Sequence, residues 1–375
     1  MSSNPLTLAF SLFLTPMKRN KYWIVIGILV IFILVIRWFS SNALWVEYYY
    51  STGIYLYLSV FLRYLLGWLP FSIGDVLYGG LVVWLLYRLV KISKVLINKE
   101  FSRSRLIASM QRLVVTLLLI YILFNSLWGI NYNRIGIASQ LGLSMEKYSV
   151  NDLKTLNGVL LQKVNESNGL LLQNPVPEMT SNEIFNKAML AYREVNKQYP
   201  FLNYHPASIK TSLWGWMGNY VGFLGYYNPF TGEGQVNTTV PKFSQPYTNC
   251  HEIAHQLGYA KENEANFVGY LAATASKEET FHYSVYLDLF LYANRNLFLA
   301  DSISAKAFTK ELHPAIKKNL REWRQFNERH KNPVEPVIRW MYGKYLESNQ
   351  QPSGVLSYNE VNSFLIAYYK KYGRL

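Results

Sequence analysis

Apolar residues gather in three long runs near the start of the chain, whereas polar residues interrupt the pattern regularly after residue 130. The runs are Tyr22–Phe39, Ile73–Val90 and Leu113–Ile130, each of 18 residues. A helix of that length rises ~27 Å, close to the hydrocarbon thickness of a bilayer. The sequence therefore predicts about three transmembrane helices within residues 1–130 and an extramembrane domain over residues 131–375.

The stretch Trp45–Leu69 is also apolar and aromatic, but it contains Gly53, Arg63 and Gly67. A charged side chain within a bilayer is costly, so we expect an interfacial or re-entrant helix here and not a fourth span. A fourth span would also move residues 131–375 to the opposite side of the membrane.

Positive charge is concentrated beside the apolar runs. Residues 1–130 carry 12 Lys/Arg against 3 Asp/Glu, while the rest of the chain carries 25 against 20. Basic residues precede the first run at Lys18, Arg19 and Lys21. More lie from the end of the second run to the start of the third: Arg88, Lys91, Lys94, Lys99, Arg103, Arg105 and Arg112. Short basic segments stay in the cytoplasm. We therefore expect a multi-pass protein of the inner membrane with residues 131–375 outside the cytoplasm, in the periplasm of a Gram-negative cell.

This charge distribution argues against two other interpretations. The net charge of +14 does not indicate nucleic-acid binding, because most of the excess flanks apolar runs and no recognition motif is present. A cleaved signal peptide is the alternative for the first run. No small-x-small cleavage site follows it, however, and two further runs favour an uncleaved anchor.

Residues 131–375 have mainly helical periodicity. The segments Thr180–Glu183 and Ser357–Glu360 are capping boxes that predict helices to about Lys197 and Tyr372. The pattern predicts further helices over residues 150–166, 279–298, 303–327 and 334–348. Short strands are expected within the Gly- and Pro-rich region 206–246, at Ala207–Leu213 and Gln235–Val240. A few strands followed by many helices predict an α+β, mostly helical domain.

The segment NCHEIAHQLG, Asn249–Gly258, contains the pattern HExxH. On a helix, His251 and His255 lie one turn apart on the same face, so both imidazoles can reach one ion. Glu252 lies to the side, where it can take a proton from water held by that ion. With only 6 histidines in the chain, a chance match is rare. The pattern predicts a Zn²⁺ site with Glu252 as the catalytic base.

A catalytic zinc site has three protein ligands and one open position. Lys261 stands where the longer pattern HExxHxxGxxH requires a third histidine, and a lysine cation cannot take that role. Two acidic residues in the following segment ENEANF, Glu262 and Glu264, are the remaining candidates for the third ligand.

The two short segments together resemble the gluzincin metallopeptidases over about twenty residues. In that group a glutamate on a second helix completes the metal site, and a polar residue four positions later orients a ligating histidine. The resemblance implies that Glu262 is the third ligand, with Glu264 as its rival, and that Asn266 orients a histidine. It also implies a zincin-like fold for residues 131–375.

A broader resemblance covers nearly the whole chain. The apolar runs, the segment GEGQVN, HExxHQxG and ExEANF are together similar to an uncharacterised family of bacterial membrane proteins that is assigned only a domain of unknown function.

Three weaker features complete the candidate site. The strand Gln235–Val240 is either an edge strand on which an extended peptide pairs or a core strand. An oxyanion donor could come from His282, Tyr283, Tyr286 or His313, although packing roles are expected for these residues. Cys250 is the single cysteine, which excludes an intramolecular disulfide, and we expect it to be an inert core residue.

Together these features predict a membrane-anchored zinc-dependent hydrolase, a metallopeptidase whose partners are membrane lipid and a peptide or protein substrate. The alternative is a non-catalytic receptor or scaffold stabilised by zinc, which would not need Glu252. An intramembrane protease is disfavoured because Tyr247–Glu264 is polar. A transporter is disfavoured because the runs lack charge pairs. The oligomeric state is not indicated.

Overall fold

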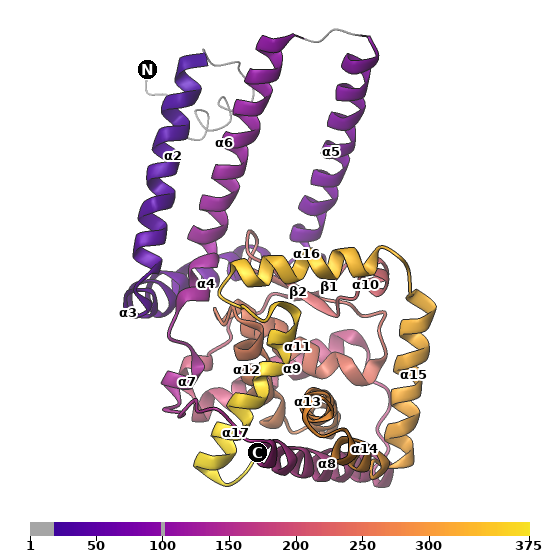
Figure 1. The fold of residues 1–375 in the computed structure, drawn as a ribbon. Helices are drawn as coiled ribbons and strands as arrows, with labels where there is room; N and C mark the ends of the chain where they lie inside the picture. Colours follow the sequence, from indigo (N-terminus) through magenta and orange to yellow (C-terminus); the bar gives the residue numbers. More distant parts are fainter. Residues whose placement is uncertain (1–18, 99–101) are drawn as a thin grey trace.

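The computed structural model describes residues 19–98 and 102–375, and Lys18 and Lys99 of the predicted basic segments lie outside them. Three long helices rise from one side of a helical domain (Figure 1): α2 (Arg19–Ser40), α5 (Ile73–Ile97) and α6 (Arg103–Leu127). Each is long and apolar enough to cross a membrane, so the prediction of three such helices is confirmed.

The boundaries of two of these helices differ from the prediction on their basic side. The helix α5 continues to Ile97, and α6 already begins at Arg103. Apolar length marks only the part that fits a bilayer, and a helix can continue into water because its backbone groups remain paired. At its other end α6 stops at Leu127, and a 3₁₀ turn, η2 (Gly129–Asn133), follows.

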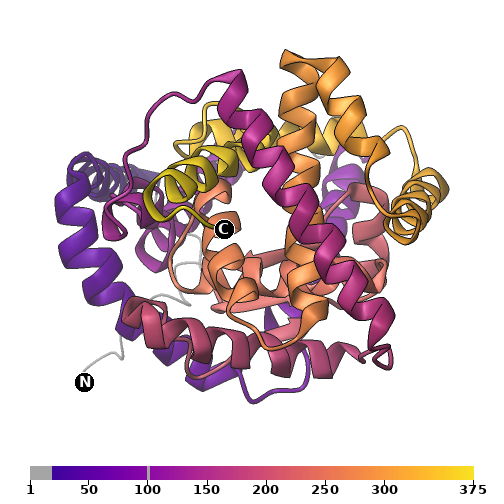
Figure 2. The same cartoon turned by 90° about the horizontal axis from the view of Figure 1, so that it is seen from below.

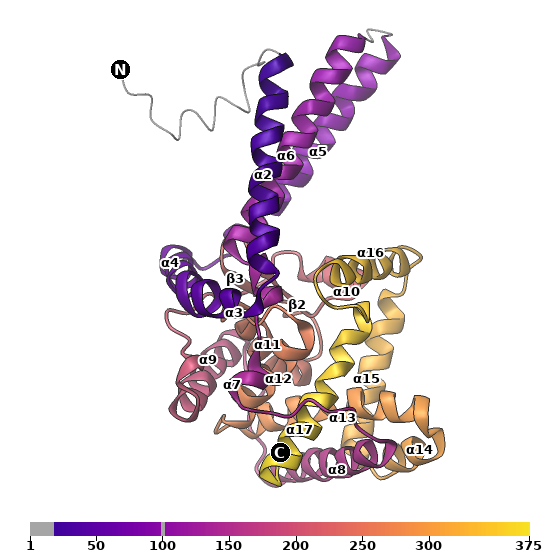
Figure 3. The same cartoon turned by 60° about the vertical axis from the view of Figure 1, so that its left-hand side comes forward.

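The segment predicted to be interfacial forms three short helical pieces, α3 (Ala43–Trp45), the π-helical η1 (Val46–Ile54) and α4 (Tyr55–Leu66). They lie at the foot of α2, against the domain and across the direction of the long helices (Figure 3). Within residues 19–98 and 102–375, only α2, α5 and α6 qualify as spans, which agrees with the prediction that no fourth span forms here.

The remaining helices build the domain below the three long ones. They are α7 (Ile137–Gln140), α8 (Val150–Gln173), α9 (Ser181–Gln198), α10 (Gly215–Val221), α11 (Gln245–Gln256), α12 (Glu262–Thr274), α13 (Glu279–Ala300), α14 (Ser302–Lys310), α15 (Pro314–His330), α16 (Glu335–Ser348) and α17 (Val361–Tyr372). Short 3₁₀ turns connect some of them: η3 (Pro200–Leu202), η4 (Lys242–Ser244) and η5 (Gly354–Glu360). The prediction of a mostly helical structure with few strands is confirmed.

Local signals explain where several of these helices begin. The capping box of Thr180 and Glu183 is present in both directions and starts α9. The predicted helix 303–327 is in fact two helices, because Pro314 fits only the first turn of a helix and therefore begins α15. The second predicted capping box is wrong: Ser357 lies inside η5, where its hydroxyl donates to the Gly354 carbonyl.

One three-stranded sheet lies beside α11. Its order is β1 (Ile209–Thr211), β3 (Glu233–Val236) and β2 (Gly225–Asn228), with β3 parallel to β1 and antiparallel to β2. The strand predicted at Gln235–Val240 overlaps β3 only at Gln235 and Val236, and β3 is the central strand. The possibility that this strand is an edge is therefore wrong, and β2 is an edge strand instead.

The helices α11 and α12 form the centre of the domain and pack closely against each other. All 12 residues of α11 are buried, and α11 also contacts α9, α13 and β3. The helix α8 packs along α13 and crosses the end of the domain away from the long helices (Figure 2). The predicted HExxH helix is thus enclosed by protein on nearly every side, which fixes its side chains in place.

Candidate metal centre

The turn after α11 brings two sequence segments together. Gly258 has a positive φ of 86°, a conformation that strongly favours glycine, and the Gly258 N–H donates to the His255 carbonyl at 3.0 Å. This confirms the predicted glycine at the helix end. The chain reverses here, so that α12 begins at Glu262 beside the last turn of α11.

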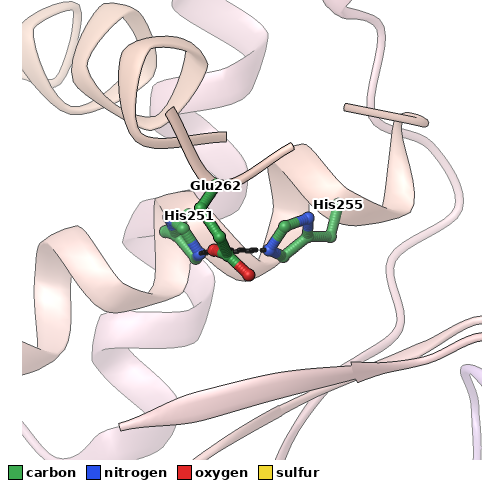
Figure 4. Close-up of side chains that lie close together, drawn as sticks. All are labelled: His251, His255 and Glu262. Carbon is green, nitrogen blue, oxygen red and sulfur yellow. Dashed lines mark hydrogen bonds and ion pairs between the residues drawn. The ribbon is translucent and has the colours of Figure 1, made fainter. Parts of the chain in front are cut away.

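Three side chains from these two helices meet at one point (Figure 4). The Nε2 atoms of His251 and His255 are 3.1 Å apart. One carboxylate oxygen of Glu262, Oε2, lies 3.2 Å from Nε2 of His251 and 3.5 Å from Nε2 of His255. All three residues are buried. They are the group of metal-binding side chains that the described residues bring within mutual reach.

Each imidazole is oriented by a hydrogen bond at its other nitrogen. Nδ1 of His251 lies 2.8 Å from Oδ1 of Asn266, and the Asn266 amide nitrogen donates to the Tyr358 carbonyl, which fixes the direction of that amide. Nδ1 of His255 lies 2.8 Å from the carbonyl oxygen of Tyr259. Both neighbours are acceptors, so each ring carries its proton on Nδ1 and turns the lone pair of Nε2 toward Glu262.

The electrostatics of the triad follow from burial and from the mutual approach of its members. Burial lowers the pKa of His251. Burial acts in the same direction on His255, but the Glu262 carboxylate outweighs it, and the pKa of His255 is raised. Burial alone would raise the pKa of Glu262, yet the positive charge of the histidines when they are protonated, and their hydrogen bonds, outweigh it and hold that pKa below its ordinary value. Glu262 is therefore an anion that faces both rings.

Glu252 lies next to this triad but does not join it. Its side chain is buried, and Oε2 has no hydrogen-bond partner among the described residues. The side chain lies against β2, because a Cβ atom at Gly225 would come within 2.4 Å of the Glu252 Oε1 atom. Burial raises the pKa of Glu252 to about 8. The glutamate therefore stands between the triad and an edge strand of the sheet.

The rival acidic residue, Glu264, points elsewhere. Its carboxylate lies against Gly136, where a Cβ atom would come within 2.0 Å of the Glu264 Oε1 atom. Arg134 and Lys261 lower the pKa of Glu264, but burial outweighs them and raises it. Of the two carboxylates, the structure thus brings only Glu262 to the imidazoles.

Several tyrosines around the triad were not anticipated. The Tyr342 hydroxyl, on α16, donates to Oε1 of Glu262 at 2.8 Å and lies 3.2 Å from the Tyr358 hydroxyl. The Tyr358 ring stacks on the His251 ring. Tyr342 lies 80 positions after Glu262. Nothing in the sequence near either residue indicates this contact, because it depends on how α16 folds back over the site.

The other residues considered as oxyanion donors have partners away from the triad. His282 contacts the Ser276 carbonyl, and Tyr283 accepts from Asn319. His313 caps α15 by accepting from Ala315, and Tyr286 packs beside His282. The packing roles expected for these residues agree with these contacts. Cys250 is fully buried, and burial raises the pKa of its thiol.

Residues that precede the domain in sequence hold the end of α11. The Ser59 and Tyr55 hydroxyls, both on α4, donate to the Gln256 carbonyl at 2.8 and 3.0 Å. The Trp128 indole N–H donates to the His255 carbonyl at 3.1 Å. These bonds satisfy carbonyls that a helix end leaves without partners. The segments beside the long helices therefore help to position the helix that carries His251 and His255.

Comparison with known proteins places the chain in a family. The model of the family described as "Protein of unknown function (DUF3810)" matches residues 50–366, and the chain belongs to this family. The matched region begins in η1 and ends in α17, so it includes α5, α6 and the whole triad. No curated protein and no solved structure matches the chain.

Proposed function

We propose that the protein is a membrane-anchored, zinc-dependent hydrolase of peptide bonds, built on a zincin-like domain. His251, His255 and Glu262 would hold the metal ion, and Glu252 would act as the general base. The observation that carries this proposal is the convergence of three acceptor atoms on one buried point.

The convergence calls for a cation. Two imidazole lone pairs and a carboxylate oxygen repel one another, and a single proton can be shared by only two of the three atoms. A metal ion satisfies all three. Tetrahedral zinc with bonds of ~2.1 Å holds neighbouring ligand atoms ~3.4 Å apart. The separations of 3.1, 3.2 and 3.5 Å are close to that spacing, and two histidines with one glutamate are a known zinc ligand set.

The residues beside the triad have complementary roles. A zinc ion, when bound, supplies Lewis-acid activation of water and of a carbonyl group. Glu252 has a carboxylate oxygen without a partner among the described residues, so in its ionised form, which a nearby cation favours, it can accept a proton from the attacking water and give it to the leaving nitrogen. Its burial between the triad and β2 keeps that oxygen from competing bonds.

The edge strand β2 favours an extended peptide as substrate. The Asn237 N–H donates to the Leu224 carbonyl, and hydrogen-bonded pairs alternate along an antiparallel ladder. The backbone groups of Gly225 and Tyr227 therefore point away from β3 toward the open edge. Gly225 is also the residue that contacts Glu252. A peptide paired with this edge would pass beside the general base.

The direct test combines metal analysis with digestion of a peptide library by the full-length protein in detergent. We expect one zinc ion per chain in the native protein and in Glu252→Gln. Hydrolysis should fall in Glu252→Gln by roughly two to four orders of magnitude, because only the base is missing. Near-native turnover in Glu252→Gln would contradict the mechanism. Tight zinc binding without cleavage of any peptide would favour the receptor or scaffold alternative.

We further propose that the domain lies outside the cytoplasm. The basic residues at the adjoining ends of α5 and α6 support this orientation, because short basic segments beside membrane spans are retained in the cytoplasm. Reporter fusions placed between α5 and α6 and after Tyr148 should report opposite compartments. A result with both reporters in the same compartment would contradict a three-span topology.

A further inference from the structure

The helix α16 turns a large apolar face away from the domain. Val337, Trp340 and Met341 are each more than half exposed, and their positions along the sequence place them on one side of the helix. The opposite side packs on the domain through Gly343 and Leu346, which are buried. An exposed apolar face of this kind marks contact with a partner that is itself apolar.

The short helix α10 lies beside α16 and is also apolar outside. It exposes Trp216, Met217 and Tyr220. The two helices contact each other, and the amide of Asn332, just before α16, donates to the Tyr220 carbonyl. We call the exposed apolar residues of these two helices the α10–α16 surface: Trp216, Met217, Tyr220, Val337, Trp340 and Met341.

Both helices of this surface adjoin candidate membrane spans. The indole of Trp214, directly before α10, donates to the Asp75 carbonyl, and a Cβ atom at Gly79 would come within 2.8 Å of the Trp214 ring. Near the end of α16, the Tyr345 ring lies edge-on to the Phe124 ring, with 6.4 Å between the centroids. Gly79 and Phe124 both belong to segments that can cross a membrane. The α10–α16 surface therefore begins where α5 and α6 join the domain.

The helix α16 has a counterpart in α4. It lies across the direction of the long helices at the end of the domain nearest to them (Figure 1), and Figure 3 shows α4 and α16 on two sides of the foot of α2. The exposed large residues of α4 are apolar or aromatic as well: Leu56, Tyr57, Val60, Phe61, Tyr64 and Leu65. Two helices far apart in the sequence thus expose apolar faces where the long helices leave the domain.

We propose that the α10–α16 surface lies in the headgroup layer of the bilayer and that, together with α4, it anchors the domain on both sides of the spans. Lipid surrounds α5 and α6 at this level when they cross a bilayer, so the surface continues an apolar boundary that already exists. Its Trp216, Tyr220 and Trp340 are of the residue types enriched at membrane surfaces. This contact is independent of the proposed hydrolase activity.

The proposed contact would bring the candidate metal centre close to the membrane. Tyr342 follows Met341 on α16, and its hydroxyl donates to Oε1 of Glu262. From the other side, the ring of Trp128, the residue directly after α6, lies 6.0 Å from the His255 ring. The triad is therefore separated from the bilayer surface by only one or two layers of side chains.

The test measures how often a nitroxide spin label collides with oxygen, which concentrates in lipid, and with a neutral nickel chelate, which stays in water. Full-length protein with Cys250→Ala is labelled at Met341→Cys and placed in phosphatidylcholine nanodiscs. The control label is at Gln162→Cys, an exposed position of α8 at the far end of the domain. Relative to the control, we expect several-fold fewer nickel collisions and more oxygen collisions at position 341, because lipid excludes the chelate. The same result is expected for Trp216→Cys on α10.

Two results would overturn the proposal. Equal collision rates with the nickel chelate at positions 341 and 162 would mean that α16 faces water. Low collision rates with both reagents at position 341 would mean that protein, such as a second copy of the chain, covers the surface. If the Met341→Cys protein does not fold, Val337→Cys, one turn earlier on the same face, takes its place, and the same two results would overturn the proposal.

Discussion

The helices α4 and α11 each have 12 residues, but the apolar helix α4 is mostly exposed and the polar helix α11 is entirely buried. The apolar sequence YLYLSVFLRYLL of α4 buries only three residues, whereas the polar sequence QPYTNCHEIAHQ of α11 is buried throughout. Apolar residues are normally inside and polar ones outside. Contact with membrane lipid is our proposed explanation for the exposed face of α4, whereas much of the buried polarity of α11 has hydrogen-bond partners inside the protein.

Several buried polar side chains of α11 have hydrogen-bond partners inside the protein. The Gln245 amide donates to the Thr238 and Val240 carbonyls, and the Asn249 amide donates to the Gln245 carbonyl. Other side-chain atoms of α11 have no partner among the described residues: one oxygen of Glu252, the amide oxygens of Gln245 and Asn249, and the amide nitrogen of Gln256. Buried polar groups are usually satisfied. Missing partners on α11 therefore do not distinguish one position by themselves, and the convergence of His251, His255 and Glu262 is the observation that supports the proposed metal ion.

The largest expected effect separates the two acidic residues at the start of α12. Glu262→Ala should reduce the zinc content of the purified protein to background, because it removes one of the three proposed ligands. The control Glu264→Ala should retain zinc and mainly lower the thermal midpoint, since that carboxylate packs against Gly136. Metal analysis of both variants gives the answer. Zinc loss in Glu264→Ala alone would reverse the ligand assignment.

A smaller loss is expected when an orienting residue changes. Asn266→Ala should weaken zinc binding by roughly 10- to 100-fold, because the His251 ring loses the acceptor that fixes its direction. Competition with a chromogenic chelator measures the affinity. Asn263→Ala is the matched control on the same helix, since Asn263 bonds to Glu360 and not to a triad histidine. Equal affinities of the two variants would argue against an orienting role.

The outer face of α4 can be tested by thiol labelling, because the native cysteine is buried. In a Cys250→Ala background, Phe61→Cys should react with a water-soluble maleimide in detergent-free nanodiscs about tenfold more slowly than Lys331→Cys, a surface control. Lipid that covers α4 is the physical reason. Equal labelling rates in nanodiscs would mean that α4 faces water, and the contrast between the two helices would then need another explanation.

The smallest expected effect concerns the bond that joins the two helices. Ser59→Ala removes the donor to the Gln256 carbonyl and should lower the free energy of unfolding by about 1 kcal/mol. Tyr57→Phe on the exposed side of α4 is the control and should leave the free energy unchanged. Chemical denaturation followed by circular dichroism measures both. An effect of the control as large as that of Ser59→Ala would contradict the role of this contact.

The sequence predicted those parts of the molecule that depend on local patterns. Three apolar runs, the capping box at Thr180 and the glycine after the HExxH helix each act within a few residues, and each is present as predicted. Membership of the uncharacterised family was also predicted and is confirmed. The zinc site and the activity stay predictions.

What the sequence did not predict depends on contacts between distant segments. The strand β3 is central because it pairs with β2, whose residues lie 5 to 11 positions earlier, and also with β1, whose residues lie 25 positions earlier. No local pattern indicates the pairing with β1. The contact of Tyr342 with Glu262 depends on the path of α16. Arg63 counted against a membrane span in the sequence, yet its burial against Tyr204 appears only when α4 packs on the domain.

A mutation can change what orients one histidine of the triad more easily than what orients the other. Asn266 orients His251 through a side chain, so a single codon change can adjust or remove that contact. A main-chain carbonyl, that of Tyr259, orients His255, and no substitution at Tyr259 deletes this oxygen. Substitutions at Asn266 can therefore change the orientation of His251 in small steps. The orientation of His255 changes only if the backbone of the turn at Gly258 changes. A random mutant library should recover variants with graded zinc affinity at Asn266, whereas folded variants at Tyr259 should keep the orientation of His255.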